Sequence, residues 1–306
     1  MANRVVESSD DLSELDEDEA SPRQHPDAER TGSLYVVSTP IGNLRDITLR
    51  AIDVLRAVDF VLAEDTRHSR HLLTHHEIDT RMVSYHEHNE ARATAATLTR
   101  LRQGLDVALI SDAGTPLLSD PGARLVRAAV EAGITVVPIP GPSALLAALV
   151  PSAIGSERFT FFGFLARKGR DREDAIRDLS SLSHTAVLYE APNRVAATLA
   201  ELQQGGAGAR RACVARELTK QFEEVRRGTV VELAAYYESS SPRGEVVIVL
   251  EGMTPQPLDE NDLRSRARQL RATGLSARDV ASALVRNDGV SRNLAYKLAH
   301  EEAHEE

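Results

Sequence analysis

Carboxylates and small residues follow an apolar segment of this chain in a pattern that could bind a ligand. The run VALI (107–110) predicts a buried strand, and Ser111 leads into the eleven-residue segment DAGTPLLSDPG (112–122). Loops longer than about 6 residues in α/β units tend to be functional, and ligands of open α/β sheets bind at the carboxyl ends of strands. An ordinary strand-to-helix connection, rich in turn-forming residues, explains the same pattern equally well.

A second set of chemically able side chains follows the apolar run FVLA (60–63). Glu64 or Asp65 could remove a proton from an alcohol, and Arg67 could hold a phosphate or lower the pKa of a neighbour. In the alternative interpretation, Asp65 caps the following helix and pairs with Arg67. The residue types do not select the base, for which the further candidates are His86, His88 and Glu190.

Four histidines between positions 68 and 76 raise the question of a metal site. His68, His71 and His75 are spaced to share one face of a helix, and His76 follows them. No cysteine or acidic residue stands at a zinc-site spacing from them. We therefore expect no metal, and interpret the histidines as a solvated basic face or a contact with RNA phosphates.

Alternating strand and helix patterns predict an α/β protein with mainly parallel or mixed sheets. In the first half the predicted strands are 34–38, 60–64, 82–85, 107–111 and 134–138, and the predicted helices begin at Asp46 or Thr48, at Asp65, at Asn89, at Ala123 and after PGPSA (140–144). In the second half the predicted strands are 158–164, 185–190, 210–217 and 245–252, the predicted helices are 171–179, 191–202 and 229–238, and 218–228 is mixed, with a hairpin as one option.

Composition divides the chain into four predicted parts. Residues 1–31 form a disordered acidic tail, 32–152 and 153–252 form two α/β domains, and 253–306 form a basic, helix-turn-helix-like extension. The extension is predicted to hold three short helices, around 259–273, 276–286 and 291–300, with Ser276 and Ser291 as N-caps. The net charge of −10 conceals a segment of about +6 between Arg264 and Lys297, which favours a nucleic-acid contact over a helical cap on the second domain. No apolar run approaches the ~20 residues of a membrane span. The single cysteine, Cys213, is predicted to be a buried strand residue, and a lone cysteine suits a reducing cytoplasm.

Nine motifs, in this order, carry a resemblance to a known family. They are LYVVSTPIGNLRDITLRA, AEDTRHSRHLL, YHEHNE, SDAGTPLLSDPG, PIPGPSALLAAL, FFGFLARKGR, YEAPNRV, ARELTK and RGEVVIVLEG. Together they resemble the ribosomal RNA small subunit methyltransferase I family, which belongs to the tetrapyrrole-methylase-like class III S-adenosylmethionine methyltransferases. The resemblance covers about residues 33–300.

The resemblance implies methyl transfer from S-adenosylmethionine to the ribose 2'-hydroxyl of a cytidine in the decoding region of 16S ribosomal RNA. It implies a cytoplasmic homodimer that acts on the small ribosomal subunit, with no membrane and no metal. It also implies two α/β domains with the cofactor cleft between them and a small C-terminal helical module.

Site residues follow from the same resemblance. The implied cofactor-binding residues are Pro40, Gly42, Asp112, Ala113, Gly114, Thr115, Leu118, Ser143, Ala144, Tyr189, Glu190 and Ala215. Pro40 and Gly42 rest on family position alone, because STPIGN matches the glycine-rich loop of tetrapyrrole methylases only at Gly42. Turn geometry explains Gly114, and core packing explains Tyr189, without any cofactor. The implied RNA contacts are Arg167, Lys168, Arg170 and Arg172, with the base sought among Glu64, Asp65 and their neighbours.

Two other functions remain open from the residues. A class III methylase could act on a small tetrapyrrole or a modified protein residue, but such substrates need no basic surface like that of residues 167–172. A non-enzymatic RNA-binding module need not keep the cofactor-shaped loops SDAGTP, PGPSA and YEAPNR. Fold analogy alone does not decide between these functions.

We expect removal of residues 1–30 to leave the methyl-transfer rate unchanged, because the family motifs begin only after them. Initial rates of the truncated and full-length proteins, measured at equal concentration, test this expectation. A large drop in rate on truncation would refute it.

Overall fold

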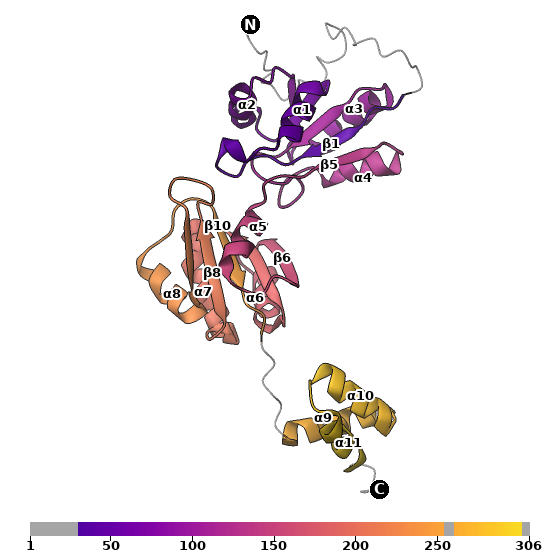
Figure 1. The fold of residues 1–306 in the computed structure, drawn as a ribbon, viewed down its shortest axis with the longest axis vertical. Coiled ribbons are helices and arrows are strands. Elements are labelled where there is room, and N and C mark those ends of the chain that lie inside the picture. The colour runs from indigo at the N-terminus through magenta and orange to yellow at the C-terminus, as the bar shows by residue number, and fades with distance from the viewer. Residues whose placement is uncertain (1–29, 254–259, 302–306) are drawn as a thin grey trace. The chain divides into compact units, whose positions relative to one another are not determined.

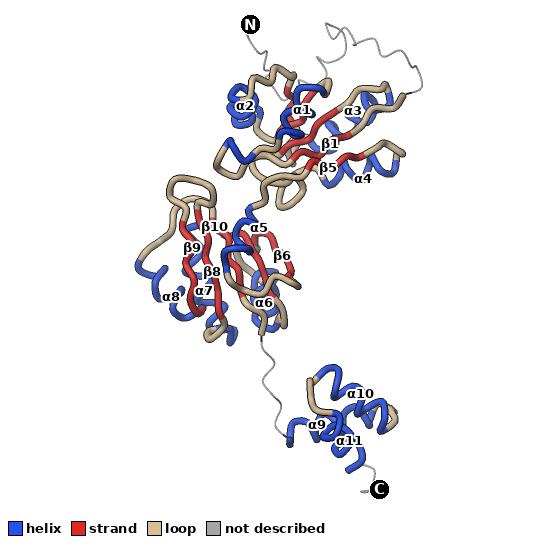
Figure 2. The backbone as a smooth tube through the Cα atoms, in the orientation of Figure 1, coloured by secondary structure: helices blue, strands red, loops and turns tan. Residues whose placement is uncertain are grey.

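The structure, a computed structural model, describes residues 30–253 and 260–301. Residues 1–29 of the predicted acidic tail and residues 254–259 of the proline-rich break lie outside the described residues. The chain divides into two compact units at Glu251/Gly252, and each is described by itself. The first unit holds two five-stranded sheets and the second is helical (Figures 1 and 2). The predicted α/β fold class with C-terminal helices is confirmed.

The N-terminal sheet is entirely parallel, with the strand order β3-β2-β4-β1-β5. Its central strand β4 is buried at every position and pairs with β1 through Leu34 opposite Val107. The strands are β1 (Leu34–Val37), β2 (Phe60–Ala63), β3 (Met82–Ser84), β4 (Val107–Ile110) and β5 (Val136–Ile139).

Helices cover both faces of this sheet. The bounds are α1 (Leu49–Ala57), α2 (Thr66–His75), α3 (Glu90–Arg102) and α4 (Ala123–Glu131). Leu55 of α1 and Leu73 of α2 share one core cluster, whereas Leu101 of α3 and Leu125 of α4 share the other. The connection after β4 therefore leaves toward the opposite face from those after its neighbours β1 and β2. Ligands of open α/β sheets bind where adjacent connections diverge in this way.

Local hydrogen bonds define the ends of these elements. Thr48 accepts a bond from the Ala51 N–H at 3.2 Å and caps α1, one of the two predicted options. Asn89 precedes α3 but does not cap it, contrary to prediction, because its amide binds the His86 N–H and the Ser84 carbonyl instead. Strand β5 begins later than predicted because the Ile134 N–H closes the end of α4.

The second sheet is mixed, with the order β6-β7-β10-β8-β9. Only β6 and β7 are parallel, and β8 and β9 form the hairpin that was one option for residues 218–228. The strands are β6 (Phe159–Phe164), β7 (Thr185–Glu190), β8 (Arg211–Arg216), β9 (Glu224–Thr229) and β10 (Val246–Leu250). Cys213 is buried on β8, as expected.

Helices α6 (Arg170–Ser181), α7 (Val195–Leu202) and α8 (Val230–Ser239) bury one face of the second sheet. Helix α5 (Ala144–Leu149) contributes Leu145 and Leu149 to the core of the other face. Ile41, from the loop after β1, joins that same core and links the two sheets. Short turns complete this unit: η1 (Leu44–Asp46), η2 (Val150–Ser152), η3 (Pro192–Arg194) and the π-helical η4 (Gln203–Ala207). The domain limits 32–152 and 153–252 stay a prediction.

The C-terminal unit consists of α9 (Glu260–Ala272), α10 (Ala277–Asn287) and α11 (Arg292–Glu301). Ser276 and Ser291 accept hydrogen bonds from the N–H groups three residues ahead, so both are the predicted caps. Gly274 and Gly289 adopt φ angles of 86° and 66° in the two turns. The three helices share a small apolar core around Leu263, Leu284 and Leu298.

Across residues 30–253 and 260–301, no helix is long and apolar enough to cross a membrane.

Candidate functional site

The loop after β4 is tied to the loops that follow β1 and β5. Thr39 and Gly114 exchange backbone hydrogen bonds of 2.8 and 3.0 Å. The Ser38 hydroxyl donates to the Thr115 hydroxyl at 3.1 Å, and Thr115 donates in turn to the Pro142 carbonyl at 3.2 Å. Three of the segments predicted to line the cofactor therefore meet at the carboxyl edge of the N-terminal sheet.

The same loop holds an unusual backbone conformation. Leu117 and Ser119 have φ angles of 75° and 72°, in the left-handed region that L-residues rarely adopt. Each such residue costs of order 1–3 kcal/mol, a strain typical of ligand-binding loops. Gly122, at φ 125°, is required where the loop enters α4, because a Cβ there would lie 2.6 Å from Leu109. This loop therefore has a specific, strained conformation, unlike an ordinary connection between a strand and a helix.

The carboxylates of Glu64, Asp112 and Asp120 lie near one another at this edge of the sheet. Burial raises the pKa of Glu64, and the neighbouring charges of Asp112 and Asp65 raise it further. Burial also raises the pKa of Asp120 to about 6, with added contributions from Glu64 and Asp112, against a Ser111 hydrogen bond that lowers it. An oxygen of Asp112 accepts the Asp65 N–H at 3.1 Å. Asp120 is thus a half-buried carboxyl group able to exchange a proton near pH 6, and the pKa of the half-buried Glu64 beside it is raised as well.

Asp65 caps helix α2 and pairs with Arg67, as in the alternative interpretation of the sequence. Its carboxylate accepts the Arg67 and His68 N–H groups at the start of α2 and pairs with the Arg67 guanidinium. Hydrogen bonds from Arg67 lower the pKa of Asp65, which makes it a weaker base than Glu64. The Arg67 side chain is 78% exposed.

Asp120 is the residue that sequence reasoning missed. The sequence alone favours a turn at this position, because Asp-Pro-Gly is a common turn sequence. Its pairing with Asp112 in one loop after a buried strand was the available signal. Nothing in the sequence places it beside Glu64, which follows a different strand.

Tyr189, at the end of β7, borders the same group. Its ring packs edge-on against Phe161 and Phe164, with centroids 4.8 and 5.4 Å away. Burial raises the pKa of Tyr189, opposed by a hydrogen bond with the Leu145 backbone and aided by the charge of Asp120. Leu145 directly follows Ser143 and Ala144, so the second sheet, α5 and the β4 loop converge here. Ala215 is fully buried in the core of the second sheet.

Gly42, in the loop after β1, faces the β8–β9 connection. Pro40 is buried, and a Cβ on Gly42 would lie 2.4 Å from the Lys220 side chain and 3.0 Å from the Thr219 hydroxyl. Within the described residues the buried Thr219 hydroxyl has no hydrogen-bond partner. Of the remaining predicted cofactor contacts, Asp112 and Ala113 are half-buried and Leu118 is 38% exposed.

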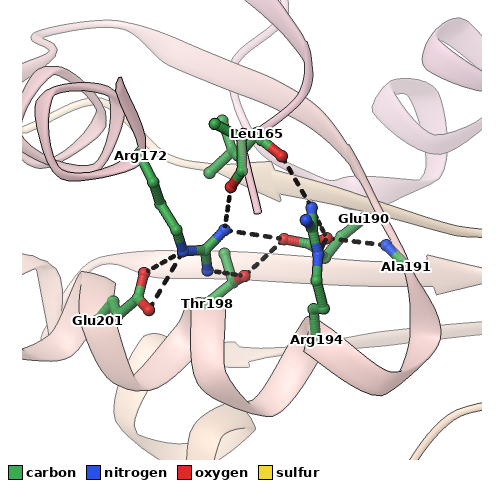
Figure 3. A network of polar contacts seen from close by, with 8 residues as sticks. Leu165, Arg172, Glu190, Ala191, Arg194, Thr198 and Glu201 are labelled. Atoms are coloured by element: carbon green, nitrogen blue, oxygen red, sulfur yellow. Dashed lines mark hydrogen bonds and ion pairs between the residues drawn. The ribbon is translucent and has the colours of Figure 1, made fainter. Parts of the chain in front are cut away.

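The burial of Glu190 and Arg172 argues against the roles predicted for them, a base or cofactor contact for Glu190 and an RNA contact for Arg172. Figure 3 shows both side chains in one network of polar contacts with Arg194, Thr198 and Glu201. Glu190 is 1% exposed, so its carboxylate is neither an available base nor a surface for the cofactor. Arg172 is 7% exposed and cannot reach an RNA phosphate from this position. Its neighbours Arg167, Lys168 and Arg170 are exposed, as an RNA contact requires.

The histidines of α2 project away from the core. His68, His71 and His75 are exposed, whereas Ser69, Leu72 and Leu73 face inward. Over the part of the chain that the structure describes, no three His, Cys, Asp or Glu residues are grouped to hold a metal ion.

Comparison with known sequences gives extensive matches. The tetrapyrrole (corrin/porphyrin) methylase family model matches residues 33–234. A protein of Synechocystis named ribosomal RNA small subunit methyltransferase I is 45% identical over 273 residues, which cover 88% of this chain and 98% of that protein. A protein of the same name from Escherichia coli O157:H7 is 41% identical over 283 residues, covering 92% and 99%.

Solved structures share the fold at much lower identity. A diphthine synthase superposes with a TM-score of 0.58 at 14% identity, covering 73% of this chain and 91% of its own. A uroporphyrin-III C-methyl transferase from Thermus thermophilus, complexed with S-adenosyl homocysteine, superposes with a TM-score of 0.54 at 19% identity, covering 72% and 97%. At these identities the likeness concerns the fold alone.

Proposed function

Because this chain belongs to the ribosomal RNA small subunit methyltransferase I family, we propose that it methylates the ribose 2'-hydroxyl of a cytidine in 16S ribosomal RNA. The methyl donor is S-adenosylmethionine and the target lies in the decoding region. The observation that carries the proposal is the identity of 41–45% over almost the full length of two relatives with that name. The carboxylates at the carboxyl edge of the N-terminal sheet support the same chemistry.

The residues at this edge fit the cofactor. Half-buried Tyr189 and exposed Leu118 offer apolar surface to an adenine, and the Asp112 carboxylate can accept hydrogen bonds from hydroxyl or amino groups. The unpartnered Thr219 hydroxyl beside Gly42 is a further polar group that a ligand would satisfy. The predicted contacts Pro40, Ala113, Gly114, Thr115, Ser143 and Ala144 complete the proposed binding segments, whereas the fully buried Ala215 offers no surface to a ligand. When bound, S-adenosylmethionine supplies an electrophilic methyl group.

Glu64 and Asp120 are the proposed proton acceptors for the RNA hydroxyl. An alcohol reacts with a methyl donor only if its proton can leave, and a carboxylate with a pKa near the working pH is suited to take it. Asp120, with its pKa raised to about 6, meets this condition best. Asp65 instead holds the start of α2, and its low pKa supports no role as the base.

The RNA strand is proposed to contact the exposed segment Arg167–Arg170. Its three cations follow β6 directly, and β6 also carries Phe161 and Phe164 against Tyr189. Phosphate contacts of this kind give affinity and orientation without sequence choice. A small tetrapyrrole would have no use for such a surface, which favours RNA as the substrate.

A homodimer in the cytoplasm completes the proposal. Leu146 and Val150 lie four residues apart on α5 and η2, hence on one side, and are 50% and 81% exposed. Exposed apolar side chains at this spacing support an interface between copies of the chain. Analytical ultracentrifugation of the full chain measures the mass directly.

Transfer of labelled methyl groups to isolated small ribosomal subunits tests the function. We expect label to enter subunits from cells that lack this modification, and none to enter subunits that already carry it. Large subunits serve as a second control. Absence of label from unmodified subunits, with S-adenosylmethionine binding confirmed by calorimetry, would contradict the proposed substrate.

A further inference from the structure

A buried carboxylate organises the end of β7. Glu190 accepts hydrogen bonds from the Ala191 N–H at 2.8 Å, from Arg194 Nε at 2.6 Å and from the Thr198 hydroxyl at 2.5 Å. Arg172 lies 3.9 Å from the same carboxylate and binds Thr198 at 2.8 Å. Both arginines therefore share one fully buried anion, which directly follows Tyr189 in the chain (Figure 3).

Each of these arginines also holds the backbone of a second segment. Arg194 donates to the Leu165 carbonyl at 3.0 Å, and Arg172 donates to the Ala166 carbonyl at 3.2 Å. These two carbonyls immediately precede Arg167, Lys168 and Arg170. The two guanidinium groups thus connect Glu190, at the end of β7, to the residues just before the exposed basic segment, Leu165 and Ala166. Their N–H donors have a fixed, planar geometry.

We propose that Arg172 and Arg194 are positioning residues for RNA, which fix the segment 167–170 relative to Tyr189 by bridging Glu190 to the Leu165 and Ala166 carbonyls. The inference rests on the proposed function and assigns a role to residues that touch neither substrate. Leu165 is 5% exposed and anchored in the core, so the segment leaves the domain from a fixed point. The left-handed Gly169, at φ 85°, then turns the chain into α6.

The physical reason is the cost of ordering charges for the substrate. Three cations on a loose loop would have to be immobilised when RNA binds, and that entropy would be lost from the affinity. In the free protein the Leu165 and Ala166 carbonyls are already held by the partly buried Arg194 and the buried Arg172, so this ordering is in place before RNA binds. Because Arg172 and Glu190 are both buried, solvent screens their interaction less than it screens a surface ion pair.

Arg194→Lys tests the contact with the Leu165 carbonyl separately from the ion pair with Glu190. A lysine can still pair with Glu190 but has no second, rigidly placed donor for the Leu165 carbonyl. We expect the KM for small subunits to rise on the order of 10-fold at 0.1 M salt, with the KM for S-adenosylmethionine unchanged. The slope of log KM against log salt should stay near the wild-type value, because the three cations remain and only their ordering is lost. Loss of all three phosphate contacts would instead lower the slope by about 2, at about 0.7 for each contact on a single strand.

A double-mutant cycle then tests positioning directly. The triple variant Arg167→Ala, Lys168→Ala, Arg170→Ala removes the charges themselves, and adding Arg194→Lys to it should raise the KM for RNA no further. Thr198→Val provides a second variant, because it removes the hydroxyl between Arg172 and Glu190 while it keeps the side-chain shape. Its effect on the KM for RNA should have the same sign.

Arg210→Lys is the matched control. Arg210 also binds backbone carbonyls, those of Leu179, Ser180 and Glu251, but it does so at the opposite end of the second sheet. It should leave the KM for RNA and its salt slope unchanged. An unchanged KM for RNA in folded Arg194→Lys, or additive effects in the cycle, would overturn the inference. A wild-type protein that transfers no methyl group would instead reject the proposed function.

Discussion

Replacement of Asp120 by asparagine should lower kcat for methyl transfer by roughly 10²–10⁴-fold, the usual contribution of a positioned base. The amide keeps the size of the side chain and cannot accept the proton of the RNA hydroxyl. Binding of S-adenosylmethionine, measured by calorimetry, should change little. Glu64→Gln should also lower kcat, because burial raises the pKa of Glu64 in the same direction.

The pH dependence follows from the same carboxylate. Asp120 acts as a base only when ionised, so the wild-type rate should rise with pH through about 6 and then level off. A folded-state pKa above the unfolded value means that ionisation of Asp120 destabilises the fold as pH rises through this range. Asp120→Asn should therefore be no less stable than the wild type at pH 7.5.

A matched control is Asp53→Asn, on the exposed face of α1. It should leave both kcat and the pH profile unchanged. If Asp120→Asn retained the wild-type rate and pH profile, Asp120 would be excluded as the base and Glu64 would become the remaining candidate of this cluster.

Replacement of Glu190 by alanine should destabilise the protein by about 3–5 kcal/mol, because it leaves the buried Arg172 and the partly buried Arg194 without their shared anion. For a unit of this size each kcal/mol lowers Tm by roughly 2–4 °C, so a fall of about 6–20 °C should be visible by calorimetry. Glu190→Gln, which can still accept hydrogen bonds, should lose less.

Glu201→Ala shows whether the loss of stability in Glu190→Ala depends on burial of the carboxylate or only on its pairing with an arginine. Glu201 also contacts Arg172, at 2.9 Å, but its side chain is 39% exposed. Its removal should cost about 1 kcal/mol or less, as for other partly exposed pairs. Equal losses of Tm for the two variants would show that the network has no buried centre.

Local patterns predicted most of the fold, because the elements of this chain are short and strongly periodic. The buried runs 60–63 and 107–110 are strands, and Thr48, Ser276 and Ser291 cap helices as expected. An error occurs where a side chain has a competing partner close by in the sequence. Asn89 binds the turn before its helix instead of the helix end.

The site was predictable in position but not in chemistry. The loop after β4 was located from its length and its place behind a buried strand. Which carboxylate has a raised pKa depends on burial and on contacts between residues 64, 112 and 120, which sequence spacing does not give. Arg172 likewise reads as one more cation in a basic segment. Only the fold shows that it turns inward to Glu190 while Arg167 and Lys168 remain exposed.

Mass spectrometry of nuclease fragments from the methylated small subunits tests the proposed reaction most directly. The expected result is one added methyl group on the ribose of a cytidine in the decoding region, absent when Asp120→Asn replaces the wild type. A methyl group on a base, or on RNA outside that region, would contradict the proposed reaction.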